Sequence, residues 1–525
     1  MKSLQAIIAD NLPLAAERLE NCYPQTIPAY RVEALCFEDT AQTMKSAGAR
    51  LSAEWGVDET LMGRGFAVYA AFARGTEYLL LRVDLPLDSP SFLSLTKLFV
   101  PAFRFERQIL SLLGFQPVGH AHSDFRPWIK HEDWPPTAWP LRKSFAANQR
   151  MPRVAGEYPW IRVEGEGIYE IPVGPVHAGI IEPGHFRFHA MGEDMINLEE
   201  RLGYTHKGIE KRFEQLSWDD GARLAGRVSG DSSVAHALTY CRAVEALADM
   251  TVPPRAAWLR AIMLERERIA NHLGDIGAIA NDVGFAFFFY QFMLLKESMI
   301  RGNQQFFGHR YQMDRVVPGG VTVDLPVNGP ALIEAELELV LAEFERLVEI
   351  YDRNTSLDDR LRTTGILPTK TAHELGVVGF VARASNQPLD CRILAPFAPY
   401  DQIPPRLITL NSCDVHARVW IRIEEIRDSV RLIRELLTTL PAGKTQVPLP
   451  AIGPDRSSLA VVEGWRGEIL YWLQSGLNGE INRCAVRDPS SVNWLGLEQA
   501  IHGNIVPDFP VCNKSFNQSY SGHDL

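Results

Sequence analysis

The sequence predicts a small α+β domain, residues 1–150, followed by a larger, mainly α-helical domain with small β-sheets, residues 151–525. A chain of 525 residues is too long for one ordinary hydrophobic core. Short β-forming runs lie before residue 100, whereas long stretches with helical apolar spacing follow residue 230. A proline-dense connector at 133–140 separates these two parts, which places the boundary near residue 150.

The first domain is expected to contain a hairpin and a helix. Phe66–Phe72 and Tyr78–Val83 are rich in β-formers, and Arg74–Glu77 between them has the composition of a tight turn. Apolar residues recur at helical spacing from Pro101 to Leu113. These elements predict a mixed α+β fold.

The second domain begins with a strand-like stretch, Ile161–Val173, and continues with long amphipathic helices. The expected helices are Val234–Met250, Ala256–Ala280, Pro330–Asp352 and Val415–Leu440. A later hairpin is expected at Ile469–Leu473 and Ile481–Val486. The most apolar run, Phe285–Leu295, is about half as long as a bilayer requires and predicts a buried helix.

Composition and charge exclude several classes of protein. With 46% apolar and 22% charged residues, the chain has the composition of a globular protein. The formal charge of −11 argues against a nucleic-acid partner. The seven cysteines include no CxxC pair, which argues against an iron–sulfur cluster or structural zinc site within the chain. Met1–Leu14 lacks the features of a signal peptide, so a cytoplasmic protein is expected.

Several sequence strings occur in an order that resembles one family. They are GPVHAG at 174–179, LGYTHKGIEK at 202–211, ERERIANHL at 265–273, GHRYQMDRVVPGGV at 308–321 and RDP at 487–489, with FERQ at 105–108 and residues 133–145 in the first domain. The chain resembles the large subunit of group 4 [NiFe]-hydrogenases, of the hydrogenase-4 and formate hydrogenlyase type. It is similar to a fusion of the 30-kDa and 49-kDa subunits of respiratory complex I, and the resemblance covers nearly the whole chain.

The resemblance implies partners that carry the electrons. A small subunit of the complex I 20-kDa type, with a [4Fe–4S] cluster, is expected to dock on this chain, and antiporter-like subunits are expected in the membrane. The residues implied to face the cluster are His206, Lys207, Glu210, Arg227 and His272. The chain would then be peripheral on the inner face of the cell membrane, attached through these partners.

The nickel ligands of the hydrogenases are missing. The segment Arg227–His236 reads RVSGDSSVAH where the hydrogenases have Arg-Val-Cys-Gly-Ile-Cys-Gly-Phe-Ala-His, so the ligand positions are Ser229 and Ser232. The second ligand pair falls at Gln518 and Ser521, an alignment that can shift by one residue. Serine hydroxyls do not replace ionised thiolates at a soft metal. The sequence therefore argues against a nickel–iron centre and H₂ activation, and the chain end directly after this motif agrees with an unmetallated site.

Without the nickel ligands, the resemblance to complex I suggests a quinone as the electron acceptor at this site. No covalently bound cofactor is expected. His177 matches the histidine of the Gly-Pro-x-His loop that approaches the quinone in complex I, but Gly230 stands where complex I has a tyrosine. Glu182 resembles a proton-relaying glutamate, or alternatively caps a turn. With Asp231 and His236, these residues would line the cavity and manage protons.

Two interpretations of the function remain open. In the first, the chain is an oxidoreductase subunit of a complex I-like assembly and passes electrons from the partner's cluster to a quinone or similar acceptor. In the second, it is a redox-silent structural or coupling subunit of the same kind of complex, because fold similarity alone does not establish chemistry. In that case, the histidines and charges would form a core-satisfied network.

Overall fold

The computed structural model describes residues 2–11, 16–19, 27–122, 124–129, 134–135, 137–149, 151, 158–178 and 181–525. The boundary predicted near residue 150 falls at Arg150 and residues 152–157, which lie outside the described residues. Asp133 and Pro136 of the predicted connector, and Gly179 of the GPVHAG motif, also lie outside them.

The N-terminal part is a five-stranded sheet with helices on one face. Its elements are α1 (Leu4–Asn11), β1 (Ala16–Arg18), β2 (Ala29–Val32), α2 (Phe37–Ser46), β3 (Arg50–Asp58), β4 (Phe66–Arg74), β5 (Glu77–Leu85), β6 (Ser91–Leu93), α3 (Ala102–Leu113) and β7 (Gln116–Val118). The strand order is β1-β2-β5-β4-β3, with β2 and β5 parallel and the other pairs antiparallel. The predicted hairpin is β4–β5 and the predicted helix is α3, so both are confirmed.

This sheet is buried on both faces. On one face, Phe37 of α2 belongs to the same core as Phe72 of β4. On the other face, Trp55 and Tyr69 pack against Trp472, with ring centroids 5.5 and 4.8 Å away. Burial on both faces explains why β4 is an almost continuous apolar run instead of an alternating one.

The described remainder of the chain is mainly helical and carries three small sheets; the two-stranded β6–β7 sheet belongs to the N-terminal part. Its elements are β8 (Ile168–Val173), β9 (His185–Met191), β10 (Asp194–Arg201), α4 (Ile209–Phe213), α5 (Trp218–Ala225), α6 (Ser233–Leu247), α7 (Pro254–Asp282), α8 (Ala286–Phe307), β11 (Val316–Val317), β12 (Gly320–Val321), α9 (Gly329–Asp352), α10 (Thr355–Leu361), α11 (Thr369–Glu374), α12 (Gly379–Ala384), α13 (Cys391–Leu394), α14 (Val415–Thr438), β13 (Ser457–Gly464), β14 (Gly467–Ser475), β15 (Ile481–Arg487), α15 (Ser490–Ala500), α16 (Phe509–Phe516) and α17 (Tyr520–Asp524).

Most predicted elements of this part are confirmed. The four predicted helices are α6, α7, α9 and α14, and the later hairpin is β14–β15. The strand expected at Ile161–Val173 begins only at Ile168. The hairpin also has a third strand, β13, which was not predicted because its eight residues are buried on both faces and show no alternation.

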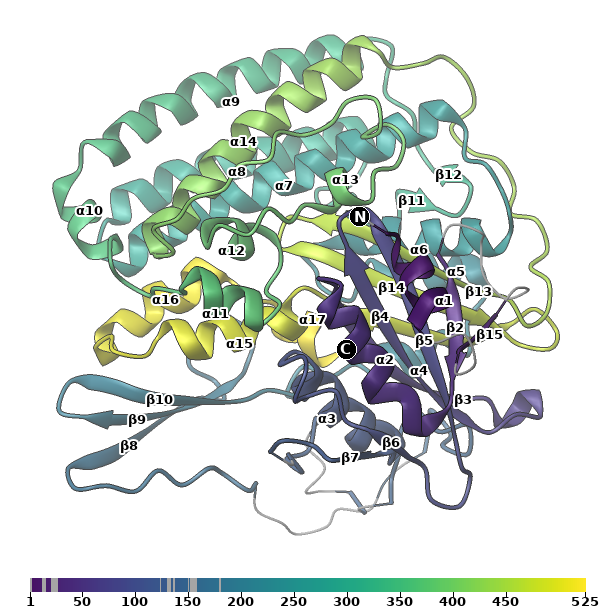
Figure 1. Ribbon diagram of the computed structural model, residues 1–525. Helices are drawn as coiled ribbons and strands as arrows, with labels where there is room; N and C mark the ends of the chain where they lie inside the picture. Colours follow the sequence, from purple (N-terminus) through teal and green to yellow (C-terminus); the bar gives the residue numbers. More distant parts are fainter. Residues whose placement is uncertain are drawn as a thin grey trace.

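The long helices α7, α8, α9 and α14 form a bundle that lies above the sheets (Figure 1). The apolar run Phe285–Leu295, which predicts a buried helix, forms the start of α8, and this helix has one buried and one exposed apolar face. Phe288 and Phe292 are buried in the bundle, whereas Phe287, Tyr290 and Leu294 are exposed. An unbroken apolar run covers every side of a helix, but the bundle contacts only one side. No helix in the described part of the chain is long and apolar enough to cross a membrane.

One buried carboxylate joins the N-terminal sheet to the C-terminal sheet. Glu468 on β14 accepts hydrogen bonds from donors on both sides, which are Arg50, Ser52, Tyr78, Cys391 and Arg487. Burial works to raise the pKa of Glu468, but the charges of Arg50 and Arg487 outweigh it and hold the pKa far below its ordinary value. The two sheets are therefore connected by an ionised group as well as by aromatic packing.

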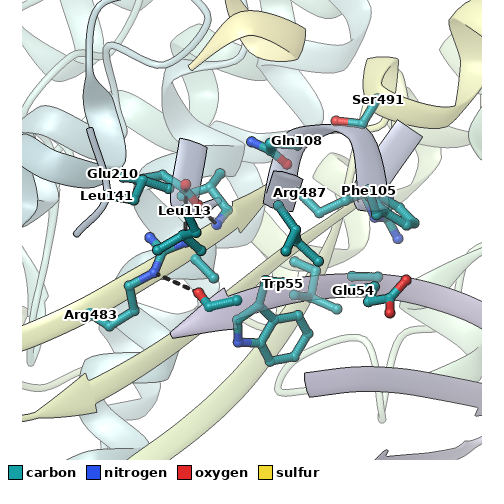
Figure 2. A pocket seen from close by; sticks show the side chains of 16 residues that line it. Glu54, Trp55, Phe105, Gln108, Leu113, Leu141, Glu210, Arg483, Arg487 and Ser491 are labelled. Atoms are coloured by element: carbon teal, nitrogen blue, oxygen red, sulfur yellow. Dashed lines mark hydrogen bonds and ion pairs between the residues drawn. The ribbon is translucent and has the colours of Figure 1, made fainter. Parts of the chain in front are cut away.

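Figure 2 shows the seam beside this cluster, where a cavity of about 20 Å³ lies between β3, α3 and β15. Arg483 is paired with Glu210 at 3.1 Å. By contrast, both carboxyl oxygens of Glu54 are buried without a hydrogen-bond partner among the described residues. Burial, and then the nearby Glu106, raise the pKa of Glu54 well above its ordinary value. A buried carboxyl group in this seam is therefore ionised where cations pair with it, as at Glu468, and neutral where none does, as at Glu54.

The substitution Glu468→Gln tests the importance of this cluster. It leaves the buried cations Arg50 and Arg487 without their carboxylate, so we expect the free energy of unfolding to fall by about 3 kcal/mol. Chemical unfolding followed by tryptophan fluorescence measures the change, because Trp55 and Trp472 lie in the seam. The control Glu343→Gln removes a carboxylate from an exposed pair and is expected to change the free energy by less than about 0.5 kcal/mol. Equal effects of the two substitutions would contradict the assignment.

Candidate functional site

The segment Arg227–Ser232 forms a tight loop between α5 and α6. Ser229 and Ser232 are buried, and the Ser232 N–H donates to the carbonyl of Ser229. The loop is fixed against α7, because the carboxyl oxygens of Glu267 accept from the N–H groups of Val234 and Ala235 at 2.7 and 3.1 Å. These contacts satisfy two of the free N–H groups at the start of α6.

The C-terminal segment meets this loop. The hydroxyl oxygen of Ser519 lies 2.8 Å from that of Ser229, and it accepts from the N–H of Gly522. The side chain of Gln518 instead donates to the carbonyl of Phe516, within its own segment. The N–H of Ser521 donates to the Glu182 carboxylate at 3.0 Å. The geometry thus favours a shift of the second ligand pair by one residue, from Gln518 and Ser521 to Ser519 and Gly522.

An arginine clamp holds the centre of the site. Both terminal nitrogens of Arg466, on the turn between β13 and β14, donate to the Asp231 carboxylate at 2.6 Å. Ser229 donates to the same carboxylate at 2.8 Å. Burial works to raise the pKa of Asp231, but the charge and hydrogen bonds of Arg466 outweigh it and hold the pKa well below its ordinary value. Asp231 is therefore a permanent anion at neutral pH.

A cavity of about 630 Å³ lies against this clamp. Its walls come from the loop after β8, the loop before α6, the helices α7 and α8 and the C-terminal segment. The lining residues include the cations Lys296, Arg466 and Lys514, the acids Glu182, Asp231, Asp275 and Asp282, and the apolar side chains Phe289 and Met293. Cavities that hold small molecules in proteins have volumes of about 300–1,000 Å³ and combine apolar walls with a few polar groups.

The structure brings together only part of the predicted catalytic set. Glu182 and Asp231 line the cavity, but His177 and His236 are not among its lining residues. His177 packs beside Tyr520 with ring centroids 6.1 Å apart, and its Nε2 has no partner among the described residues. His236 is fully buried, with one ring nitrogen 2.9 Å from Asp488 and the other 3.0 Å from the Tyr471 hydroxyl. It belongs to the core, because both of its nitrogens are already engaged.

The residues predicted to face a partner's cluster also separate. His206, Lys207 and Glu210 line one hollow of about 200 Å³. Arg227 lies nearby, since Lys207 Nζ donates to its carbonyl at 2.7 Å, but its side chain points to Asp314 at the surface. His272 is fully buried in the helical bundle and pairs with Glu425 at 2.9 Å. His272 therefore does not share a surface with the other four residues.

The sequence analysis did not single out the three cations of the cavity wall or its residue Ser519. Arg466, Lys296 and Lys514 were not singled out, because single basic residues in strands and helices are usually solvated. The predicted ligand position Gln518 lies one residue before Ser519, which makes the contact with Ser229. Arg466 lies in the turn between two fully buried strands, a position that was not predicted because β13 was not predicted.

Known proteins match the chain over both of its parts. Residues 30–151 match the model of the 30-kDa subunit of respiratory-chain NADH dehydrogenase, and residues 282–458 match that of its 49-kDa subunit. Formate hydrogenlyase subunit 5 of Escherichia coli is 30% identical, with 91% of this chain and 85% of that protein covered. Hydrogenase-4 component G of E. coli is 31% identical, with 90% and 83% covered. The structure of an archaeal membrane-bound sulfane sulfur reductase complex contains a chain of the same fold, with a TM-score of 0.65 and 24% identity over 69% of this chain and 99% of that chain.

The fold and the matches define a complex I-like oxidoreductase subunit in which the 30-kDa-like and 49-kDa-like parts follow one another in a single chain. Within this class, the chain belongs to the family of formate hydrogenlyase subunit 5 and hydrogenase-4 component G.

The relatives that are named hydrogenases imply a nickel–iron group, and the residues present do not fit it. Ser229 and Ser519 offer hydroxyls that are hydrogen-bonded to one another, and Ser232 offers a third. Asp231 and Arg466 fill the adjacent space with an ion pair. Among the described residues, no group of three or more His, Cys, Asp or Glu side chains is placed to hold a metal ion. The donor set lacks the ionised sulfur that a soft metal requires.

The substitution Asp231→Asn tests the clamp through its dependence on pH. The pKa of Asp231 in the folded chain lies below its ordinary value of 3.8. The stability that the Asp231 carboxylate contributes is therefore complete above pH 3.8, and it is lost as the pH falls through the lowered pKa of the folded chain. We expect the variant to be less stable by about 1–2 kcal/mol at neutral pH, a modest cost because the carboxylate also faces the cavity. The difference should shrink as the pH falls from about 5 to about 2. Unfolding titrations at several pH values measure it, and a difference that does not change with pH would contradict the clamp.

Proposed function

We propose that this chain is a peripheral-arm subunit of a membrane-associated, complex I-like oxidoreductase. In this proposal, it passes electrons from a partner's iron–sulfur cluster to a quinone or a similar acceptor, without a nickel–iron centre. The observation that carries the proposal is the cavity of about 630 Å³, which lies where the two ligand segments of the hydrogenases meet and is lined by serine, carboxylate and ammonium groups instead of thiolates. The family membership supplies the context.

The entry side for electrons would be the hollow that contains His206, Lys207 and Glu210. The C-terminal segment fixes it, because the Asp524 carboxylate accepts from the N–H groups of Gly203 and Thr205, and His206 Nδ1 donates to the Asp524 carbonyl at 2.8 Å. Burial lowers the pKa of His206, so the ring is neutral. A small subunit of the 20-kDa type carrying a [4Fe–4S] cluster would dock here.

The shape and chemistry of the cavity suit an amphiphilic acceptor such as a quinone. Phe289 and Met293 of α8 give it an apolar wall, and Asp231 with Ser229 gives it a polar floor. The ring of a quinone needs hydrogen-bond donors at its oxygens and an apolar surface against its face. Lys296, a cation in the wall, would stabilise negative charge that develops on such an oxygen.

The side chains of the loop after β8 would orient the acceptor. Glu182 is held by the N–H of Ser521, which aims it at the cavity from the C-terminal side. His177 packs beside Tyr520 of the cavity wall, and its Nε2 has no partner among the described residues; burial lowers its pKa, so the ring is a neutral imidazole. A quinone would supply the redox chemistry when bound, and the residues of this chain would position it and exchange protons with it.

Attachment to the membrane would be through antiporter-like partner subunits on the cytoplasmic face. The relatives include formate hydrogenlyase subunit 5 and the membrane-bound hydrogenase subunit alpha of Pyrococcus furiosus, which is 28% identical over 68% of this chain. The exposed apolar face of α8, formed by Phe287, Tyr290 and Leu294, offers a surface for a subunit at the membrane.

One observation favours the alternative, a redox-silent coupling subunit. The ion pair of Asp231 and Arg466 and the serine contacts satisfy one another without a ligand. A site whose polar groups are already paired can serve as a rigid connection between subunits.

The substitution His177→Ala in the purified complex tests the two functions. If the chain reduces quinone, we expect added quinone to reoxidise the partner's reduced cluster in the wild type. The variant should be slower by about tenfold or more, because the ring that packs beside Tyr520 of the cavity wall is lost. Electron paramagnetic resonance of the cluster measures the rate. His185→Ala is the matched control, since the Nε2 of His185 is also buried without a partner among the described residues, but its ring packs beside Trp160, which does not line the cavity.

A cluster that quinone does not reoxidise in the intact wild-type complex would favour the coupling subunit. Elemental analysis of the same sample is expected to find no stoichiometric nickel. One nickel per complex would contradict the proposed absence of a nickel–iron centre.

A further inference from the structure

A second hollow lies behind the clamp. It is large enough for about one water molecule, with a volume of about 20 Å³. It shares Gly230, Asp231, Asn271 and Lys296 with the main cavity, so the same residues separate the two spaces. It is also lined by Arg310, whose side chain is 41% exposed, and by Tyr311, which is 45% exposed. The hollow therefore borders both the wall of the main cavity and residues that reach the protein surface.

Glu267 of α7 lines this small hollow and is buried. Its carboxyl oxygens accept from backbone N–H groups of α6, and among the described residues no cation lies within ion-pair distance of it. Other buried carboxylates near it have such partners: Glu265 is 3.1 Å from Arg392, and Glu425 is 2.6 Å from Arg383. Glu267 is thus a buried acid that faces a space for water and lacks a fixed counter-ion.

Burial, more than the charged groups around it, favours the neutral form of Glu267. Burial raises the pKa of Glu267 to about 8; the charge of Asp231 adds to this effect, whereas the two N–H groups and Arg268 oppose it. Lys296 and Arg310 line the same hollow from α8 and from the loop after it. Asp231 is ionised and held by Arg466, so it cannot exchange protons near neutral pH. Two neighbouring carboxyl groups with pKa values moved apart divide into a fixed anion and an acid.

We infer that Glu267 is the proton relay for the acceptor in the main cavity, and that it is recharged from solvent through the hollow beside Arg310 and Tyr311. The inference rests on the proposed quinone reduction. For each electron that the partner's iron–sulfur cluster gives to the quinone, one O–H bond forms at a quinone oxygen. The O–H bond of Glu267 breaks, and the proton moves through water past Lys296. The carboxylate then regains a proton from solvent, so that two electrons and two protons convert one quinone to its quinol.

The substitution Glu267→Gln in the purified complex tests the relay. Glutamine keeps an acceptor for one of the two N–H groups of α6 but carries no exchangeable acidic proton. We expect reduction of a short-chain ubiquinone to fall by about 100-fold, because a positioned proton donor contributes about 10²–10⁴-fold. Reduction of ferricyanide, which takes an electron without a proton, should stay within about twofold of the wild type. Glu267→Asp keeps the acid and should recover much of the quinone rate, and Glu343→Gln is the surface control.

Two further readouts separate the relay from a structural role. The wild-type quinone rate should decline as the pH rises through about 8, when Glu267 loses its proton, and this decline should be absent in Glu267→Gln. Infrared difference spectra should show the carbonyl stretch of a protonated carboxylic acid at neutral pH, which is lost in the glutamine variant.

Each contrary outcome identifies what has failed. Unchanged quinone reduction in Glu267→Gln, an equal loss with ferricyanide, or an ionised Glu267 at neutral pH would overturn the relay alone. A wild-type complex that reduces no quinone would overturn the proposed function and the relay together.

Discussion

The burial of Glu468 between two sheets is the constraint on which the arrangement of the chain depends. Its carboxylate accepts from Arg50, Ser52 and Tyr78 on one side and from Cys391 and Arg487 on the other. A buried carboxylate is tolerated only when paired and hydrogen-bonded. The N-terminal sheet therefore has one position on β13–β15, and the aromatic contacts of Trp472 follow from it.

This seam also determines where the candidate site lies. The strand β14 that carries Glu468 begins at the turn that carries Arg466, so the sheet contact and the clamp on Asp231 share one strand. The C-terminal segment then closes the site: Ser519 meets Ser229, and Asp524 fixes the segment that contains His206. The C-terminal segment thus contributes both to the cavity and to the hollow lined by His206, Lys207 and Glu210.

The two acidic side chains Asp231 and Glu267 differ in the groups that they pair with. Asp231 has a bidentate arginine and is a fixed anion, whereas Glu267, on α7, has backbone N–H groups as its hydrogen-bond partners among the described residues. In a low-dielectric interior, the presence or absence of one guanidinium decides which group keeps its proton. The loss of thiolates at Ser229 and Ser232 therefore leaves a site with organised charge.

The sequence by itself determined the family motifs, the β4–β5 hairpin and the helices α6, α7, α9 and α14, because periodicity and turn composition act locally. It also determined that Ser229 and Ser232 offer no thiolates. Only the tertiary structure decided that His236 belongs to the core, that His272 lies away from the hollow lined by His206, Lys207 and Glu210, and that Ser519, not Gln518, meets Ser229. Arg466 and Glu267 were likewise found only there, since each obtains its role from a residue far away in the chain. Contacts between distant segments leave no periodic signal, and the pKa of a carboxyl group depends on its neighbours in space.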